Sequence, residues 1–179
     1  IVVFVFDGLQ ISQVTPRLMP CLSTFASGGI RFAYHHPVFP TVTRVNVASL
    51  TTGRYPGGHG LVGNTFVHRS LGTNQVLHAL RPELSKIIER TGTLLLAPTL
   101  ATILGANGME YVAVGIGSNG NAFIHNPLAI RDGGATIHPD FCEPGNLYDD
   151  IVTRFGPWPE ITHPAAARLE HGVMVLTEY

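Results

Sequence analysis

The sequence predicts an α/β fold in which a doubly wound, mainly parallel sheet carries helices on both faces. Two observations predict this fold. Segments with the composition of strands alternate with segments of helical periodicity, as a parallel sheet requires. Hydrophobic residues make up 45% of the 179 residues and charged residues only 13%. That balance is typical of buried parallel strands with near-continuous apolar runs, or of one part of a larger body.

The first third of the chain predicts two strands and two helices. The apolar run from Ile1 to Phe6 predicts a buried first strand. Prolines followed by apolar residues at helical spacing predict a helix over 20–27, which a glycine pair ends. Residues 30–34 predict the second strand. Residues 43–52 predict a helix of small and β-branched residues, followed by a glycine-rich loop.

The rest of the chain predicts one strand and four helices. The strand covers residues 111–114, and the helices cover 83–90, 99–105, a segment opened by Pro144 and a segment that starts near 162–164. In the last helix, Leu169, Val173 and Leu176 form the apolar side. This helix has no stop signal before Tyr179. We therefore expect residues 1–179 to be the N-terminal portion of a single α/β domain whose remainder lies outside this chain.

The net charge, the hydropathy and the cysteine count show which kinds of partner and which structural features the sequence gives no sign of. The net charge is -1, so the chain has no basic footprint for a nucleic-acid polymer. The longest apolar candidate, residues 94–104, is shorter than a membrane span and contains Pro98. Cys21 and Cys142 are too few for a disulfide framework. The compartment stays undecided, and association with a separate second half or a second copy is an open alternative.

Asp7 and Thr43 are the candidate chemical groups. Asp7 follows the first predicted strand, and in open α/β sheets ligands bind at the carboxyl ends of strands. A carboxylate there suits a divalent cation, although Asp-Gly is also a common turn dipeptide. Thr43 enters a predicted helix, where threonine is also an ordinary cap. A metal-activated hydroxyl at a helix N-terminus can attack a phosphoryl group, and Asn46 lies on the same face.

Several motifs carry a resemblance to a known family. Phe6-Asp7-Gly8, Met19-Pro20 with Gly29-Ile30-Arg31-Phe32, and Pro40-Thr41-Val42-Thr43 with Asn46 and then Thr52-Gly53-Arg54-Tyr55-Pro56-Gly57-Gly58-His59-Gly60 resemble the type I phosphodiesterase / nucleotide pyrophosphatase family of the alkaline phosphatase superfamily. The run from Pro40 to Gly60 is the most specific part. The likeness covers the N-terminal part of a typical member only.

The resemblance implies a fold and a mechanism. It implies an alkaline-phosphatase-like α/β domain and a hydrolase that acts on phosphodiesters or nucleotides. Thr43 would be the nucleophile that forms a phospho-threonine. Asp7 and Thr43 would ligate two divalent metal ions, expected to be zinc. Asn46 and the backbone N–H of Arg44 would hold the phosphoryl oxygens, and His59 would shape the glycine-rich loop.

The chain departs from the family pattern in two ways. Arg44 replaces an aromatic residue of the nucleotide-cleaving members, which leaves the leaving-group preference open. The later metal motifs, of P-D-x-x-G-H and D-H-G type, do not occur. His138-Pro139-Asp140 and Glu170-His171-Gly172 differ in position and flanks, so we interpret them as ordinary loop and helix residues. We therefore expect little or no catalysis from this chain alone.

A glycine motif supports a competing interpretation. Gly115 to Gly120 has the form G-x-G-x-x-G after a predicted strand. The dinucleotide fingerprint must open a helix, whereas the residues that follow here look like a strand or a loop. The alternative to an enzyme is thus a non-catalytic nucleotide- or phosphate-binding module.

Overall fold

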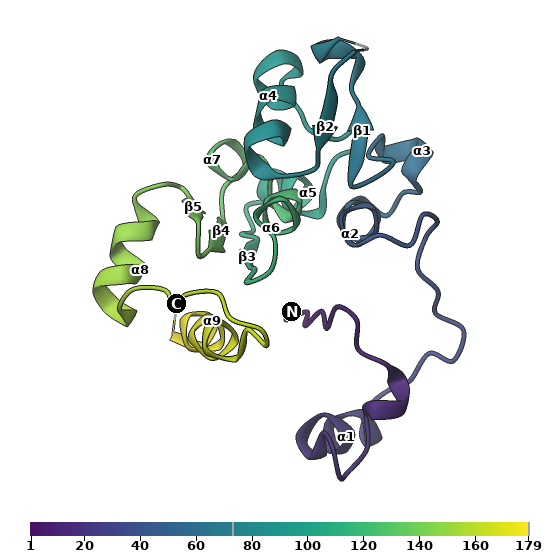
Figure 1. Cartoon of the computed structure of the whole chain (residues 1–179), viewed down its shortest axis with the longest axis vertical. Helices are drawn as coiled ribbons and strands as arrows, with labels where there is room; N and C mark the ends of the chain where they lie inside the picture. Colours follow the sequence, from purple (N-terminus) through teal and green to yellow (C-terminus); the bar gives the residue numbers. More distant parts are fainter. Residues whose placement is uncertain (73, 179) are drawn as a thin grey trace. The chain divides into compact units, whose positions relative to one another are not determined.

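The computed structural model describes residues 1–72 and 74–178. The chain divides into two compact units, Ile1–Pro37 and Val38–Tyr179, called here the first and the second unit (Figure 1). No helix in the described part of the chain is long and apolar enough to cross a bilayer. Whether the two units belong to one hydrolase domain, as the sequence predicts, stays a prediction.

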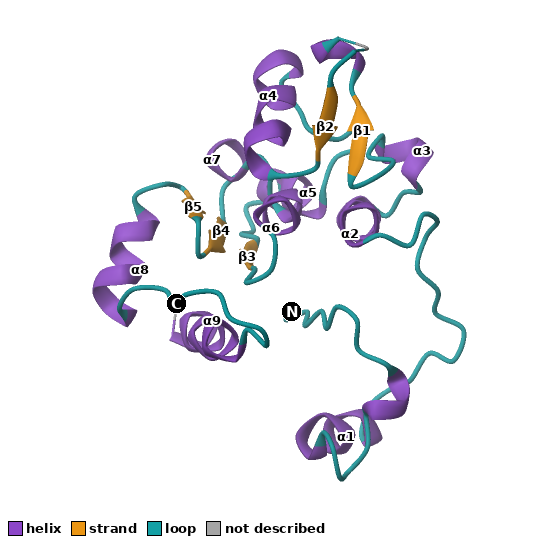
Figure 2. Ribbon diagram, in the orientation of Figure 1, coloured by secondary structure: helices purple, strands orange, loops and turns teal. Residues whose placement is uncertain are grey.

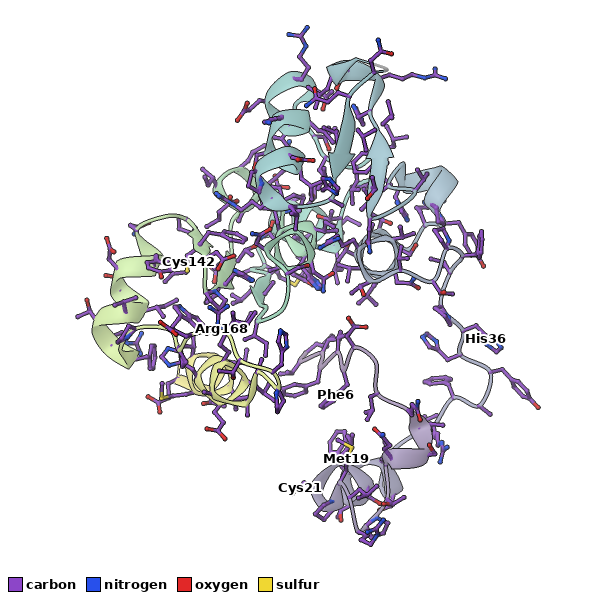
Figure 3. The ribbon with its side chains drawn as sticks, in the orientation of Figure 1. Phe6, Met19, Cys21, His36, Cys142 and Arg168 are labelled. Atoms are coloured by element: carbon purple, nitrogen blue, oxygen red, sulfur yellow. The ribbon has the colours of Figure 1, made fainter. Side chains whose placement is uncertain are left out.

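The first unit contains a short 3-10 helix, η1 (Ile11–Gln13), and the helix α1 (Pro20–Ser27). Pro20 occupies the first turn of α1 and Gly28 follows its last residue, which confirms the predicted start and stop. None of the residues of α1 is buried. Cys21 of α1 is exposed and Cys142 of the second unit is buried, and both are free thiols (Figure 3).

The two strands predicted in the first unit are wrong. Residues 1–6 and 30–34 form no strand, and the strands of both sheets lie between residues 65 and 143. The apolar run is exposed along its length, from Ile1 to Phe6. The least exposed of these residues is Phe6, with 52% of its surface accessible to solvent (Figure 3). Strand composition gives only a preference, because a strand forms when a neighbouring strand takes its backbone hydrogen bonds.

The second unit contains the remaining helices. They are α2 (Thr43–Thr52), α3 (Pro56–His59), η2 (Arg69–Leu71), α4 (Arg81–Thr91), α5 (Leu100–Ala106), α6 (Asn119–His125), α7 (Ala129–Asp132), α8 (Leu147–Phe155) and α9 (Ala166–Glu178). The predicted helices at 43–52, 83–90, 99–105 and after Pro144 are confirmed. Part of the predicted glycine-rich loop is helical, because Pro56 opens the single turn α3.

The strands of the second unit form two small sheets (Figure 2). β1 (Thr65–Val67) pairs with β2 (Val76–His78) in an antiparallel hairpin. β3 (Val112–Val114), which confirms the predicted strand, is parallel to β4 (Ala135–His138), and β4 is antiparallel to β5 (Phe141–Glu143). The α/β class is therefore confirmed, but only one of these strand pairs is parallel. The connection between β4 and β5 is too short for a crossover, so this pair has to be antiparallel.

Two hydrophobic clusters form the core of the second unit. One cluster packs α4 and α6 against the β1–β2 hairpin around Leu77, Leu84 and Phe123. The other packs α8 and α9 against β4 around Ile137 and Ile151. The helix α2, which carries Thr43, belongs to the first cluster, because it contributes Val47 and Ala48 to it.

The helix α9 is present, but the apolar side predicted for it is not its buried side. Leu169 and Val173 keep 54% and 46% of their surface, whereas His171, Gly172 and Val175 are buried. A Cβ on Gly172 would lie 2.7 Å from the side chain of Ile116. Close approach at a glycine, rather than the most apolar stripe, decides which side of α9 packs.

Candidate active site

The helix α2 places Thr43 at its first residue. Val42 before it is extended, with φ -106° and ψ 145°, and the N–H of Asn46 donates to the carbonyl of Val42 at 3.1 Å, which closes the first helical turn. Gly53 ends the helix in the left-handed conformation, with φ 64°. Thr43 is half-buried. The start of a helix carries a partial positive charge and N–H groups that its own hydrogen-bond ladder does not use.

The amide of Asn46 holds the segment that leads into α2. Its Oδ1 accepts from the N–H of Val38 at 2.8 Å. Its Nδ2 donates to the carbonyl of Val42 at 3.0 Å, and lies 3.4 Å from the carbonyls of Val38 and Pro40. The short bonds fix the side chain, and the longer contacts share the second Nδ2 hydrogen. The structure thus brings Asn46 next to the start of α2 and commits most of its amide to the protein backbone.

Arg44 is a half-buried cation beside Thr43. Its Nε is buried and has no hydrogen-bond partner among the described residues. Burial lowers the pKa of the Arg44 guanidinium. An orphaned buried donor costs free energy, so Arg44 is a poor structural residue and a suitable donor for an anion that binds at this end of α2.

His59 and Ser49 form a contact that the sequence did not predict. Nε2 of His59 lies 2.9 Å from Oγ of Ser49 in α2, and Nδ1 of His59 accepts from the N–H of Leu61 at 3.2 Å. His59 therefore connects α2 with the glycine-rich segment. The role in shaping the loop that the resemblance implies for this residue stays a prediction. The His59-Gly60 pair in the glycine-rich segment is a signal in the sequence that His59 has a role, but the sequence does not show that its partner is Ser49.

Asp7 belongs to the first unit and Thr43 to the second. Asp7 is exposed and precedes Gly8, whose φ of 75° and the contact of the Leu9 N–H with the Phe6 carbonyl at 3.4 Å make a turn. This local geometry agrees with the turn preference of an Asp-Gly pair. Each candidate residue is thus placed within its own unit.

The described residues do not assemble a metal site. Among residues 1–72 and 74–178, no three His, Cys, Asp or Glu side chains are grouped so that they can hold a metal ion. A structural zinc site takes four ligands and a catalytic one takes at least three from the protein. The residues present therefore do not fit a complete zinc centre, and only Asp7 and Thr43 are predicted ligands.

The two histidine motifs that resemble metal motifs have packing roles. Nδ1 of His138 accepts from the N–H of Asp140 at 3.0 Å and its Nε2 lies 2.9 Å from the carbonyl of Gly117. Both ring nitrogens of His138 are thus used by the backbone. His171 is a buried residue of α9, and the centroid of its ring lies 4.5 Å from that of Trp158.

The glycine motif before α6 opens a helix, contrary to the prediction of a strand or a loop after it. α6 begins at Asn119, and Gly120 in its first turn is buried. A Cβ on Gly120 would collide with the carbonyl oxygen of Ala79 and come within 2.9 Å of the Cα of Leu80. This glycine therefore permits close packing of α6 against the segment before α4.

Two cavities in the second unit lie away from the start of α2. One, of about 260 Å³, lies between the segment 93–102 and residues 127–131. The other, of about 60 Å³, is lined by His59 and its neighbours. Neither is lined by Thr43, Arg44 or Asn46. These two cavities are therefore separate from the candidate site at the start of α2.

Comparison with known proteins identifies a family for most of the chain. A family profile described as type I phosphodiesterase / nucleotide pyrophosphatase matches residues 1–159. The chain is 31% identical over 81 residues to a venom phosphodiesterase of Macrovipera lebetinus, a match that covers 44% of this chain and 10% of that protein. It is 29% identical over 76 residues to ectonucleotide pyrophosphatase/phosphodiesterase family member 3 of Bos taurus, covering 41% of this chain and 9% of that protein.

The match to these relatives spans about a tenth of their length, so they are similar to one part of the chain and extend far beyond it. No solved structure gives a match. The family profile, in contrast, covers most of the chain, including Asp7, Thr43, Arg44 and Asn46. The chain belongs to the type I phosphodiesterase / nucleotide pyrophosphatase family.

Proposed function

We propose that this protein takes part in the hydrolysis of phosphodiesters or nucleotide pyrophosphates, with Thr43 as the nucleophile. The observation that supports the proposal is the place of Thr43 at the first residue of α2, inside the segment that the family profile matches. A phosphoryl group in front of a helix N-terminus is favoured by the N–H groups and by the helix dipole. Its phosphorus would then face the Thr43 hydroxyl.

The reaction has two displacement steps. In the first, Oγ1 of Thr43 loses its proton and forms a bond to phosphorus, while the bond from phosphorus to the leaving oxygen breaks and that oxygen takes up a proton. In the second, a water oxygen attacks the phosphorus of phospho-threonine, the bond to Oγ1 breaks, and the Thr43 hydroxyl is restored. Covalent catalysis of this kind divides one difficult displacement into two easier ones.

Asn46 and Arg44 are proposed to hold the phosphoryl oxygens. The backbone N–H of Arg44 lies in the first turn of α2, where the helix ladder leaves such groups without an acceptor. One Nδ2 hydrogen of Asn46 is held by Val42 at 3.0 Å. The other is shared between two carbonyls at 3.4 Å, a weak arrangement that a charged oxygen can replace.

Asp7 and Thr43 are proposed as ligands of a site for two zinc ions whose other ligands are not among the described residues. A bound divalent cation lowers the pKa of a coordinated hydroxyl and stabilises charge on oxygen. Because the described residues do not complete such a site, we propose that the 179-residue chain alone has little or no catalytic activity.

The finer architecture is also a proposal. We propose that the complete domain has the doubly wound, mainly parallel sheet of alkaline phosphatases, of which β3 and β4 form one parallel pair. The connection between them carries α6 and α7, as the crossover of a parallel pair requires. A solved structure of the longer protein in which β3 and β4 lie outside such a sheet would contradict this proposal.

The nucleophile is tested by Thr43→Ala in the full-length protein. We expect hydrolysis of an aryl phosphodiester to fall by about a thousandfold or more. Thr41→Ala, at an exposed threonine of the same motif, is the matched control and should retain activity. Acid quenching during turnover should also trap a phosphoryl group on the peptide that contains Thr43. Unchanged hydrolysis by Thr43→Ala would refute the proposal.

The metal proposal is tested by analysing the bound metal of the purified 179-residue chain after dialysis against zinc. We expect less than one tightly bound ion per chain, because the ligand set is incomplete. Two tightly bound zinc ions per chain would show that these residues are sufficient, and would contradict the expected inactivity.

A second candidate is a non-catalytic nucleotide- or phosphate-binding module. The observation in its favour is that a helix, α6, does follow the glycine motif. Titration with NAD and with a phosphate ester analogue separates the two functions. NAD binding that survives Thr43→Ala and Asn46→Ala would favour the module, whereas analogue binding that both substitutions abolish would favour the hydrolase site.

A further inference from the structure

The imidazole of His59 joins three parts of the second unit. His59 is the last residue of α3 and is completely buried, with 0% of its surface exposed. Its ring contacts Oγ of Ser49 in α2 at 2.9 Å and the N–H of Leu61 at 3.2 Å. Its backbone carbonyl accepts from the N–H of Leu96 at 3.1 Å. One residue thus connects α2, the glycine-rich segment and the segment before α5.

The contacts of His59 determine its tautomer. A backbone N–H can only donate, so Nδ1, which accepts from Leu61, carries no proton. In the neutral ring the single proton is then on Nε2, which donates to Oγ of Ser49. Burial lowers the pKa of His59 and so favours this neutral form. Because Nε2 already carries a proton, His59 cannot accept one from Ser49, and the pair is no nucleophile–base dyad.

Asn46 and Ser49 hold α2 at two points that are three residues apart, about 4.5 Å along the helix axis. Asn46 ties the start of the helix to Val38 and Val42. Ser49 lies six residues after Thr43, about 9 Å further along the helix axis at the usual rise per residue. A helix that is fixed at one point can still tilt about it. The core packing of Val47 and Ala48 already limits this tilt, and the hydrogen bond to Ser49 restricts it further, and with it the variation in where Thr43 lies.

We propose that His59 is a positioning residue for Thr43, because the hydrogen bond from its Nε2 to Ser49 sets the orientation of α2. The inference rests on the proposed function, since Thr43 matters as the nucleophile. The hold on α2 itself follows from the contacts alone. The glycine-rich segment thus acts at a distance from the reacting atoms, because it carries the side chain of His59 that orients α2.

Two near-isosteric variants separate the two ring contacts. His59→Gln keeps an amide donor near the place of Nε2 and loses the acceptor at Nδ1. His59→Asn keeps an acceptor near the place of Nδ1 and loses the donor at Nε2. Each variant gives up one hydrogen bond, so their overall loss of stability should be similar. Ser49→Ala removes the partner in α2 while His59 stays, and is the independent third variant.

Hydrogen exchange of the α2 amides from Asn46 to Leu50 is the first measurement. We expect His59→Asn and Ser49→Ala to exchange faster in α2, by up to about tenfold, and His59→Gln to exchange like the unsubstituted protein. Titration with inorganic phosphate, followed at the amides of Arg44 and Val45, is the second. There we expect His59→Gln to retain the affinity and the other two variants to lose it by a similar factor.

The outcomes are distinguishable. Equal exchange in α2 for His59→Gln and His59→Asn, after correction for overall stability, would overturn the positioning role. Faster exchange in His59→Gln than in His59→Asn would overturn it as well. If phosphate leaves the Arg44 and Val45 amides of the unsubstituted protein unchanged, the proposed phosphoryl site fails, while the exchange comparison still decides the role of His59.

Discussion

Oδ1 of Asn46 accepts a hydrogen bond at 2.8 Å from the N–H of Val38, eight residues earlier in the chain. Nδ2 of the same side chain donates to Val42 at 3.0 Å. One amide therefore supplies an acceptor and a donor to the two ends of the segment that leads into α2. A residue that the family likeness assigns to substrate also builds the entry to the helix.

Asn46→Ala should destabilise the protein by about 1–2 kcal/mol, because it removes both side-chain hydrogen bonds and leaves the N–H of the half-buried Val38 without this acceptor, whereas the Val42 carbonyl keeps the backbone N–H of residue 46. Asn46→Asp keeps the acceptor for Val38 but places a carboxylate oxygen where Nδ2 faces the carbonyls of Val38, Pro40 and Val42, so its loss should be at least as large. Urea unfolding measures the difference. A free energy of unfolding that is equal in Asn46→Ala and the unsubstituted protein would mean that these contacts are unimportant.

Arg44→Met should leave the stability unchanged or raise it by about 1 kcal/mol, because the buried Nε of Arg44 has no partner among the described residues. The same substitution should weaken the binding of inorganic phosphate at the start of α2. Arg54→Met, at an exposed arginine after the helix, is the control and should alter neither quantity much. A large loss of stability in Arg44→Met would show that the guanidinium has a structural partner.

The sequence was informative where local chemistry decides the structure. The helix α2 begins at Thr43 and ends before Gly53, as predicted. A threonine at a helix start and a glycine just after a helix end are both local signals in the sequence. The strand predicted for the run Ile1–Phe6 does not form, because strand formation depends on a neighbour that composition does not specify. The apolar side of α9 does not identify the side that packs, because Gly172 lies against Ile116 from a distant part of the chain.

The candidate site could be predicted only in part. Thr43, Arg44 and Asn46 lie within one helical turn, so sequence spacing alone puts them together. The contact between Ser49 and His59 depends on how the glycine-rich segment folds back, and the partners of Asn46 depend on the path of residues 38–42. Neither path follows from a periodic pattern.

The stability of the protein should fall as the pH falls from about 6.5 to about 4. Burial lowers the pKa of His125 to about 4, and Tyr111, which faces it, contributes a hydroxyl at 3.1 Å. The pKa values of His59 and His138 are lowered as well. Below the ordinary histidine pKa, near 6.5, the unfolded chain binds protons that the folded protein does not, so acid favours unfolding. For His125 alone the loss approaches about 3 kcal/mol at pH 4.

Urea unfolding at pH 7 and pH 4.5 measures this dependence, and His125→Asn identifies the contribution of His125. The asparagine retains an acceptor for the Tyr111 hydroxyl but cannot take up a proton, so the difference in stability between the two pH values should shrink. His36→Asn, at an exposed histidine of the first unit, is the control. Stability that rises on acidification would contradict the expected sign.

Gly120→Ala should destabilise the protein by about 2–3 kcal/mol or prevent folding, because the new Cβ would collide with the carbonyl of Ala79 in the buried contact between α6 and the segment before α4. Gly117→Ala lies in the same motif, has open space around its Cβ, and should stay within about 1 kcal/mol of the unsubstituted protein. Urea unfolding compares the two. If the motif served instead to cradle a phosphate, Gly120→Ala would leave the free energy of unfolding unchanged and impair binding of NAD. A packing role predicts instead that Gly120→Ala lowers the free energy of unfolding, because the backbone of Ala79 and Leu80 already occupies the space next to this glycine.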